Sequence, residues 1–157
     1  MPSRLQSELR QSRPFRSRRQ EAFLSILRSA DVLRRAVAAL LDPYGITPQQ
    51  YNVLRILRGA GPEGLPTLAI GERLIEQTPG MTRLLNRLEA RGWVERTRNA
   101  HDRRQVDCRM TPAGQELLAR LDPLMDAADQ TMLATLTPEQ LDSLIQTLDL
   151  VRANPGF

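Results

Sequence analysis

Three polar side chains that can read DNA bases share one side of a predicted helix that begins at Thr78; they are Arg83, Asn86 and Arg87. An arginine can donate two hydrogen bonds to guanine in the major groove, and an asparagine pairs in a similar way with adenine. At about 100° per residue, the apolar residues of this helix fall on the opposite side. These residues are Met81, Leu84, Leu85 and Leu88. On its own, such a polar face is more often an ordinary solvated surface, so the neighbouring elements decide the interpretation.

A second polar group lies at a predicted hairpin tip, and it consists of His101, Asp102, Arg103 and Arg104. An arginine at such a tip can reach into the narrow minor groove of A·T tracts. Asp102 would be repelled by DNA, so we expect it to orient an arginine through a charge-assisted hydrogen bond. An ordinary polar turn is the alternative. His101 and Asp102 also suggest an acid–base pair, but no nucleophile or third partner accompanies them, and we expect no enzyme.

The elements that position these residues follow from helix and turn signals. Thr followed by Pro suits a helix start, because the Thr side chain caps a backbone N–H and Pro is tolerated in the first turn. Four such pairs begin at Thr47, Thr78, Thr111 and Thr137. Gln50 and Gln140 complete capping boxes with two of them. The predicted helices span 16–42, 48 to about 59, 66–77 and 78–91, followed by one from Thr111 and one from Thr137.

Two segments, 93–98 and 104–110, are predicted to form a β-hairpin around the turn at 99–103. The short helix before Thr78 is expected to carry an apolar face made of Leu68, Ala69, Leu74 and Ile75. Pro123 is expected to kink the helix that follows Thr111. A helix pair followed by a hairpin is the layout of a winged helix-turn-helix, whose second helix enters the major groove. The fold class is therefore mainly α, with a two-stranded β-hairpin wing.

Composition narrows the function further. The chain has 157 residues and a formal net charge of +4, and all 22 of its basic residues are Arg. Residues 112–157 carry two Arg and seven acids, a net charge of −5, whereas residues 71–111 carry nine Arg and six acids, a net charge of +3. A basic middle and an acidic end favour one face that binds a polyanion. One cysteine and one histidine exclude a disulfide framework, a Cys-based zinc cluster and a His-rich metal site, so we expect no cofactor.

The first 20 residues carry six Arg and one Glu, a net charge of +5. Three interpretations remain open for this segment: a disordered arm that adds phosphate contacts, a helical extension of a dimer interface, or a solvated tail. It has no apolar core of the kind that a secretory signal needs, and the apolar runs elsewhere are too short to span a membrane. We therefore expect a cytoplasmic protein without a membrane partner.

The stretch from Thr78 to Arg96, TPGMTRLLNRLEARGWVER, resembles the recognition helix and first wing strand of MarR-type transcriptional regulators. Asp102-Arg103-Arg104 and the run MTPAG from Met110 to Gly114 resemble the same family. The element order is similar from about residue 20 to 153. Two features are unusual for the family, namely Trp93 in place of a smaller aliphatic residue and the run Ala69-Ile70-Gly71.

The resemblance implies an obligate homodimer that places two recognition helices in successive major grooves of a pseudo-palindromic operator. A helical dimerisation region would comprise 21–45 and 112–157, and the DNA-binding lobe would comprise 46–111. Carried over by position, the DNA contacts of the recognition helix are Pro79, Gly80, Thr82, Arg83 and Arg87. In the wing, the resemblance makes Arg104 the minor-groove arginine, Asp102 its orienting partner and Arg103 a phosphate contact.

Members of the family commonly bind small aromatic or phenolic ligands and then release DNA. Phe23, Tyr44 and Tyr51 are candidates to line such a site, although plain core packing is the preferred interpretation of all three. Cys108, on an apolar strand face, is expected to be a small buried hydrophobe and no oxidation sensor. The resulting hypothesis is a homodimeric repressor that a small ligand releases from its operator. The alternatives are a DNA-binding module without ligand control and a transcriptional activator.

Overall fold

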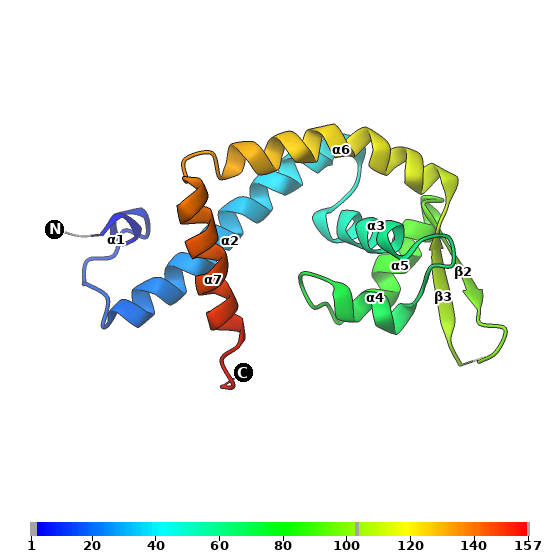
Figure 1. The fold of residues 1–157 in the computed structure, drawn as a ribbon, viewed down its shortest axis with the longest axis horizontal. Helices are drawn as coiled ribbons and strands as arrows, with labels where there is room; N and C mark the ends of the chain where they lie inside the picture. Colours follow the sequence, from blue (N-terminus) through cyan, green and yellow to red (C-terminus); the bar gives the residue numbers. More distant parts are fainter. Residues whose placement is uncertain (1–2, 103, 157) are drawn as a thin grey trace. The chain divides into compact units, whose positions relative to one another are not determined.

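The fold is given by a computed structural model that describes residues 3–102 and 104–156. The chain divides into two compact units, one ending at Leu118 and the other beginning at Ala119, and the two are described separately below. Figure 1 traces both units along the chain. Within the described residues, no helix is long and apolar enough to cross a membrane.

The first unit opens with helices. A short helix, α1 (Arg4–Glu8), lies in the Arg-rich first 20 residues and precedes the long helix α2 (Arg18–Leu41). A 3-10 turn, η1 (Asp42–Tyr44), then leads into α3 (Pro48–Ala60). The helices predicted at 16–42 and from 48 to about 59 are therefore confirmed within one or two residues. The capping box of α3 is also confirmed, because Thr47 and Gln50 each accept a hydrogen bond from the other's backbone N–H. Such a cap stabilises a helix by about 1 kcal/mol.

The helix-turn-helix consists of α4 (Thr67–Arg73) and α5 (Met81–Ala90), and α3 packs against both. The predicted start of α5 at Thr78 is wrong by three residues. Thr78 caps no helix; its Oγ1 instead accepts a hydrogen bond from the Gly80 N–H, two residues on. Such a local turn competes with helical hydrogen bonding. Gly80 becomes the N-cap, so Pro79 and Gly80 lie in the turn that leads into α5.

The wing belongs to a three-stranded antiparallel sheet, and the predicted two-stranded hairpin forms two of its strands (Figure 1). The strands are β1 (Leu65–Pro66), β2 (Val94–Arg98) and β3 (Val106–Met110), in the order β1-β3-β2. Strand β1 pairs Leu65 with Cys108, and it was missed because two residues carry no alternating pattern. Gly64 precedes it at φ +72°, where an added Cβ would collide with the Cys108 carbonyl oxygen.

The core of the first unit is aliphatic and continuous from α3 to the sheet. Its fully buried side chains include Leu54 and Leu57 of α3, Ile70 of α4, and Leu85 and Leu88 of α5. The apolar face predicted for α4 is partly wrong, because Leu68 is 76% and Ile75 is 86% exposed. Helix α4 has only seven residues, so it buries a single side chain fully, and Ile75 already lies beyond its end.

The second unit contains the end of α6 (Pro112–Met132) and all of α7 (Pro138–Arg152). Thr111 accepts a hydrogen bond from the Gly114 N–H at the start of α6, and Thr137 forms a complete capping box with Gln140, so both predicted helix starts are confirmed. Pro123 lies inside α6; the kink expected there stays a prediction. Helix α7 has no buried residue, which leaves its apolar stripe without a cover in this chain.

Candidate nucleic-acid interface

Helix α5 presents the two faces that its sequence pattern predicts. Leu84, Leu85 and Leu88 are at most 8% exposed, and they pack the helix onto the core. On the other side, Thr82, Arg83, Asn86 and Arg87 are exposed. Within the described part of the chain, the guanidinium groups of Arg83 and Arg87 form no hydrogen bond or ion pair. Both groups are therefore available to a polyanion or to base edges.

Asn86 differs from these two arginines because it is already bonded. Its Oδ1 accepts a hydrogen bond from Arg96 Nη2 of β2 at 2.6 Å. The same Arg96 donates through its side chain and its backbone N–H to Glu89. These hydrogen bonds from Arg96 hold the pKa of the Glu89 carboxyl below its usual value. Asn86 thus joins α5 to the wing, and its use as an adenine reader stays a prediction that requires it to exchange this partner.

Arg96 is the residue of this surface that the sequence did not single out. It lies on a strand seven residues after Glu89, and only the fold brings the strand against the exposed edge of α5. Its side chain is 22% exposed, whereas the Glu89 side chain is 40% exposed. The Arg96 network therefore fixes the angle between α5 and β2, the two elements that would enter neighbouring DNA grooves.

The amino end of α5 has the features of an anion site. No side chain caps the helix, because Gly80 is its N-cap and Thr78 bonds to the turn instead. The first N–H groups of a helix lack partners within the helix, and they carry the positive end of the helix dipole. A phosphate that approaches Pro79 and Gly80 would meet these groups, in line with the DNA contacts expected at this turn.

The wing tip is organised by two short polar side chains. Asn99 Oδ1 accepts from the backbone N–H groups of His101 and Asp102, at 2.8 and 3.0 Å. Asp102 Oδ1 accepts from the backbone N–H of Arg104 at 2.9 Å. Asp102 thus bonds to the main chain of Arg104 and shapes the turn there; the charge-assisted hydrogen bond to an arginine side chain stays a prediction. Arg104 is exposed, and Arg103 lies outside the described residues.

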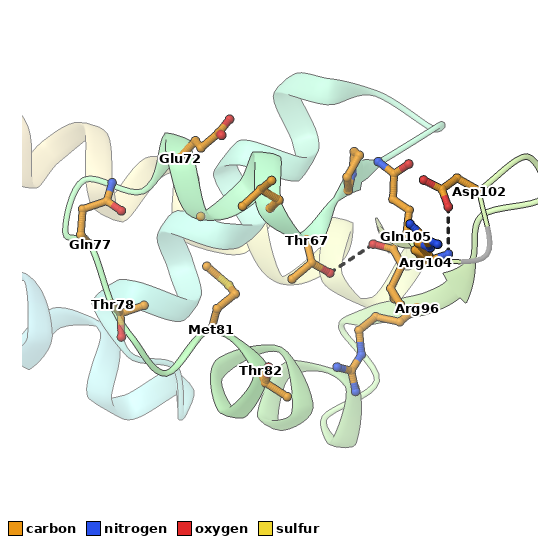
Figure 2. A pocket seen from close by; sticks show the side chains of 14 residues that line it. Thr67, Glu72, Gln77, Thr78, Met81, Thr82, Arg96, Asp102, Arg104 and Gln105 are labelled. Atoms are coloured by element: carbon orange, nitrogen blue, oxygen red, sulfur yellow. Dashed lines mark hydrogen bonds between the residues drawn. The ribbon is translucent and has the colours of Figure 1, made fainter.

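A cleft of about 870 Å³ lies between α4, the start of α5 and the wing. Figure 2 shows Met81 and Thr82 on one side of it and Arg96, Arg104 and Asp102 on the other. The Thr67 hydroxyl at the edge of α4 donates to the Val106 carbonyl oxygen and ties α4 to the wing. The cleft thus separates the start of α5 from the wing.

The three aromatic candidates for a ligand site lie in different surroundings. Phe23 is 58% exposed on α2. Tyr51 is buried on α3, and its hydroxyl accepts a hydrogen bond from Arg55 Nη1 at 3.0 Å. Tyr44 is half-buried in η1. Neither of the two cavities described for this structure is lined by any of them, so an aromatic ligand site at these residues stays a prediction.

Cys108 is fully buried on β3, as expected from its strand pattern. Burial raises the pKa of its thiol to about 11. The thiolate, which is the reactive form, is therefore scarce near neutral pH.

A helix-turn-helix whose second helix exposes two free arginines, followed by an antiparallel wing, defines a winged-helix DNA-binding protein. The comparisons with known proteins specify it further. The family model described as MarR family matches residues 44–105. The HTH-type transcriptional regulator TtmR of Methylorubrum extorquens is 34% identical over 134 residues, which cover 84% of this chain and 68% of that protein. The chain belongs to the MarR family of transcriptional regulators.

Solved structures agree with this assignment. A MarR transcription factor from Planctomyces limnophilus is 37% identical, with a TM-score of 0.67 over 87% of this chain and 98% of that one. A mutant of Escherichia coli MarR, solved in complex with operator DNA, is 27% identical, with a TM-score of 0.73 over 80% of this chain and 89% of that one. The resemblance inferred from the sequence is thus confirmed, as are the mainly helical fold class and the winged helix.

Proposed function

We propose that this chain binds a pseudo-palindromic operator as a homodimer, with α5 of each subunit in a major groove and the wing in the adjacent minor groove. The observation that carries the proposal is the free guanidinium pair of Arg83 and Arg87 above a buried leucine face. The similar E. coli protein was solved on operator DNA, which supports the same use of the surface here. Thr82, Pro79, Gly80, Arg103 and Arg104 would complete the contacts to the DNA.

The dimer is proposed because two helices have apolar faces that this chain leaves uncovered. On α2, the exposed fractions are 58% for Phe23, 51% for Leu27 and 39% for Ile26. On α7, they are 57% for Ile145 and 41% for Val151. Exposed stripes of this kind mark interaction surfaces, and a symmetric partner is the simplest cover for them.

The regulator is proposed to be a repressor that a small aromatic ligand releases. A ligand can do this only if it binds the DNA-free arrangement of the two lobes better than the DNA-bound one. Operator occupancy then falls as ligand is added, and transcription resumes. A DNA-binding module without ligand control would keep its affinity at every ligand concentration, and an activator would lower transcription when it is released.

The experiment that tests the proposal is selection of operators from random duplex DNA, repeated at several salt concentrations. We expect an enriched sequence with two half-sites about one helical turn apart. The affinity should fall steeply as the salt concentration rises, because arginines that bind phosphates release counterions from the DNA. Sedimentation of the free chain should give a dimer. Enrichment of no sequence would refute operator recognition, and a monomer on a single half-site would refute the paired arrangement.

A further inference from the structure

The connection between α4 and α5, residues 74–80, is bonded to two helices outside the helix-turn-helix. Arg34 Nε of α2 lies 2.7 Å from Glu76 Oε1. The backbone N–H of Ile75 donates to Asn52 Oδ1 of α3 at 3.0 Å. Arg34 and Glu76 are 42 positions apart in the sequence, so their contact links the long helix α2 to the segment that leads into α5.

Burial in the core anchors the start of this connection. Leu74 is 6% exposed and anchors the chain to the core, whereas Ile75, the next residue, is 86% exposed. Two polar contacts tie the residues that follow to other helices, namely Ile75 N–H to Asn52 and Glu76 to Arg34. The bonds to Asn52 and Arg34 therefore hold Ile75 and Glu76, six and five residues before α5 begins.

We propose that Arg34 is a positioning residue for operator binding, which acts through Glu76 to place the amino end of α5. This role rests on the proposed function, since it is read out as operator affinity. Arg34 need not touch DNA. Arg34 pairs with Glu76, and four residues later the same segment reaches Gly80, the N-cap of α5. The first turn of α5 then carries Thr82 and Arg83. A displacement of α2 is transmitted to the same turn through the same ion pair.

The strength of the pair sets the size of the expected effect. The Arg34 and Glu76 side chains are 50% and 45% exposed, and an ion pair in water of this kind stabilises its geometry only modestly. We therefore expect loss of the pair to weaken operator binding by about two- to fivefold for each subunit, not to abolish it. The protein should remain folded, because Asn52 and Leu74 still hold the connection.

A charge-reversal cycle tests the role. Operator affinity is measured at one salt concentration for the parent protein and for Arg34→Glu, Glu76→Arg and the double variant. Both single variants should bind more weakly, and the double variant should recover most of the loss, because it rebuilds the pair with the charges exchanged. Glu76→Arg is decisive, since it makes the protein more basic, and long-range attraction to phosphates alone would tighten binding.

Arg35→Glu is the matched control. It makes the same change in charge one residue further along α2, but Arg35 pairs with Asp31 of the same helix, at 3.0 Å, and should leave α5 in place. Thermal unfolding identifies any variant that fails to fold. The milder variants Arg34→Gln and Glu76→Gln then replace the reversals, and the coupling appears as a loss in the double variant that is smaller than the sum of the two single losses.

Three outcomes would overturn the role: tighter binding by Glu76→Arg, additive effects in the double variant, or equal losses for Arg34→Glu and Arg35→Glu. A parent chain that selects no operator would instead refute the proposed function and, with it, the readout of this role.

Discussion

Three arginines of this surface show that the partner of a residue decides its role more than its type does. Arg83 and Arg87 have no bonded partner within the described residues, so their five donors each remain available to DNA. Arg96 donates to Glu89 and Asn86, and its charge is already balanced inside the protein. We therefore propose that Arg83 and Arg87 recognise DNA, whereas Arg96 joins α5 to the wing.

Replacement of Arg83 by Ala should cost about 1–3 kcal/mol of operator binding and relax the base preference at one position in each half-site. The reason is that a guanidinium bonded to one base pair discriminates there and nowhere else. The measurement is the affinity of parent and variant for a panel of operators, each with one base pair changed. Arg35→Ala provides the control for lost charge, and a variant that ranks the whole panel as the parent does would contradict the assignment.

The buried thiol of Cys108 makes a prediction about pH. Its pKa is raised from 9.0 to about 11 by burial, so the native state keeps the thiol proton between these values while the unfolded state loses it. The contribution of Cys108 to the free energy of unfolding is therefore complete below pH 9 and declines as the pH rises from 9 to 11. Denaturant titrations over this range should show the decline in the parent, and Cys108→Ala should show less of it. Equal slopes in the two proteins would contradict the prediction.

At the scale of elements, local signals predicted most of the fold and failed where distant contacts decide. The capping boxes at Thr47 and Thr137 depend on residues three positions apart, so the sequence was enough to find them. Thr78 has the same Thr-Pro signal, but its hydroxyl bonds within the turn, and α5 starts later. The partnership of Arg96 with Glu89 and Asn86 could not be predicted, because it depends on how a strand packs against a helix.

The junction between the wing and α6 should tolerate no side chain at Gly114. A Cβ there would collide with the Trp93 carbonyl oxygen and press on the Met110 side chain. The Trp93 carbonyl cannot easily give way, because it accepts the Thr111 N–H. We expect Gly114→Ala to lower the free energy of unfolding by about 1–3 kcal/mol.

Gly59→Ala is the matched control, because Gly59 lies in α3 with nothing within 4 Å of an added Cβ. Alanine there should stabilise the helix by about 0.5–1 kcal/mol. Denaturant unfolding of both variants provides the comparison. A Gly114→Ala protein as stable as the parent would show that the start of α6 can move away from β2.

At the scale of the whole molecule, the proposed dimer explains why α7 has good helix signals and no buried residue. An amphipathic helix without tertiary contacts gains little from its apolar stripe in a lone chain. In a dimer, the stripe would bury Ile145 and Val151, and helix formation would then be coupled to association. Stability should accordingly rise with protein concentration.

Ile145→Asp tests this coupling, because Ile145 is 57% exposed in the single chain and an aspartate there can remain in water. In the dimer, the same aspartate would be buried without a partner, at a cost of several kcal/mol. We expect the variant to sediment as a monomer and to lose the dependence of its Tm on concentration. It should bind the operator far more weakly than the parent does, because a monomer can contact only one half-site. Gln146→Asp, at the next position of α7, which is also exposed but already polar, should remain dimeric. If both variants behave alike, the apolar stripe of α7 does not form the dimer interface.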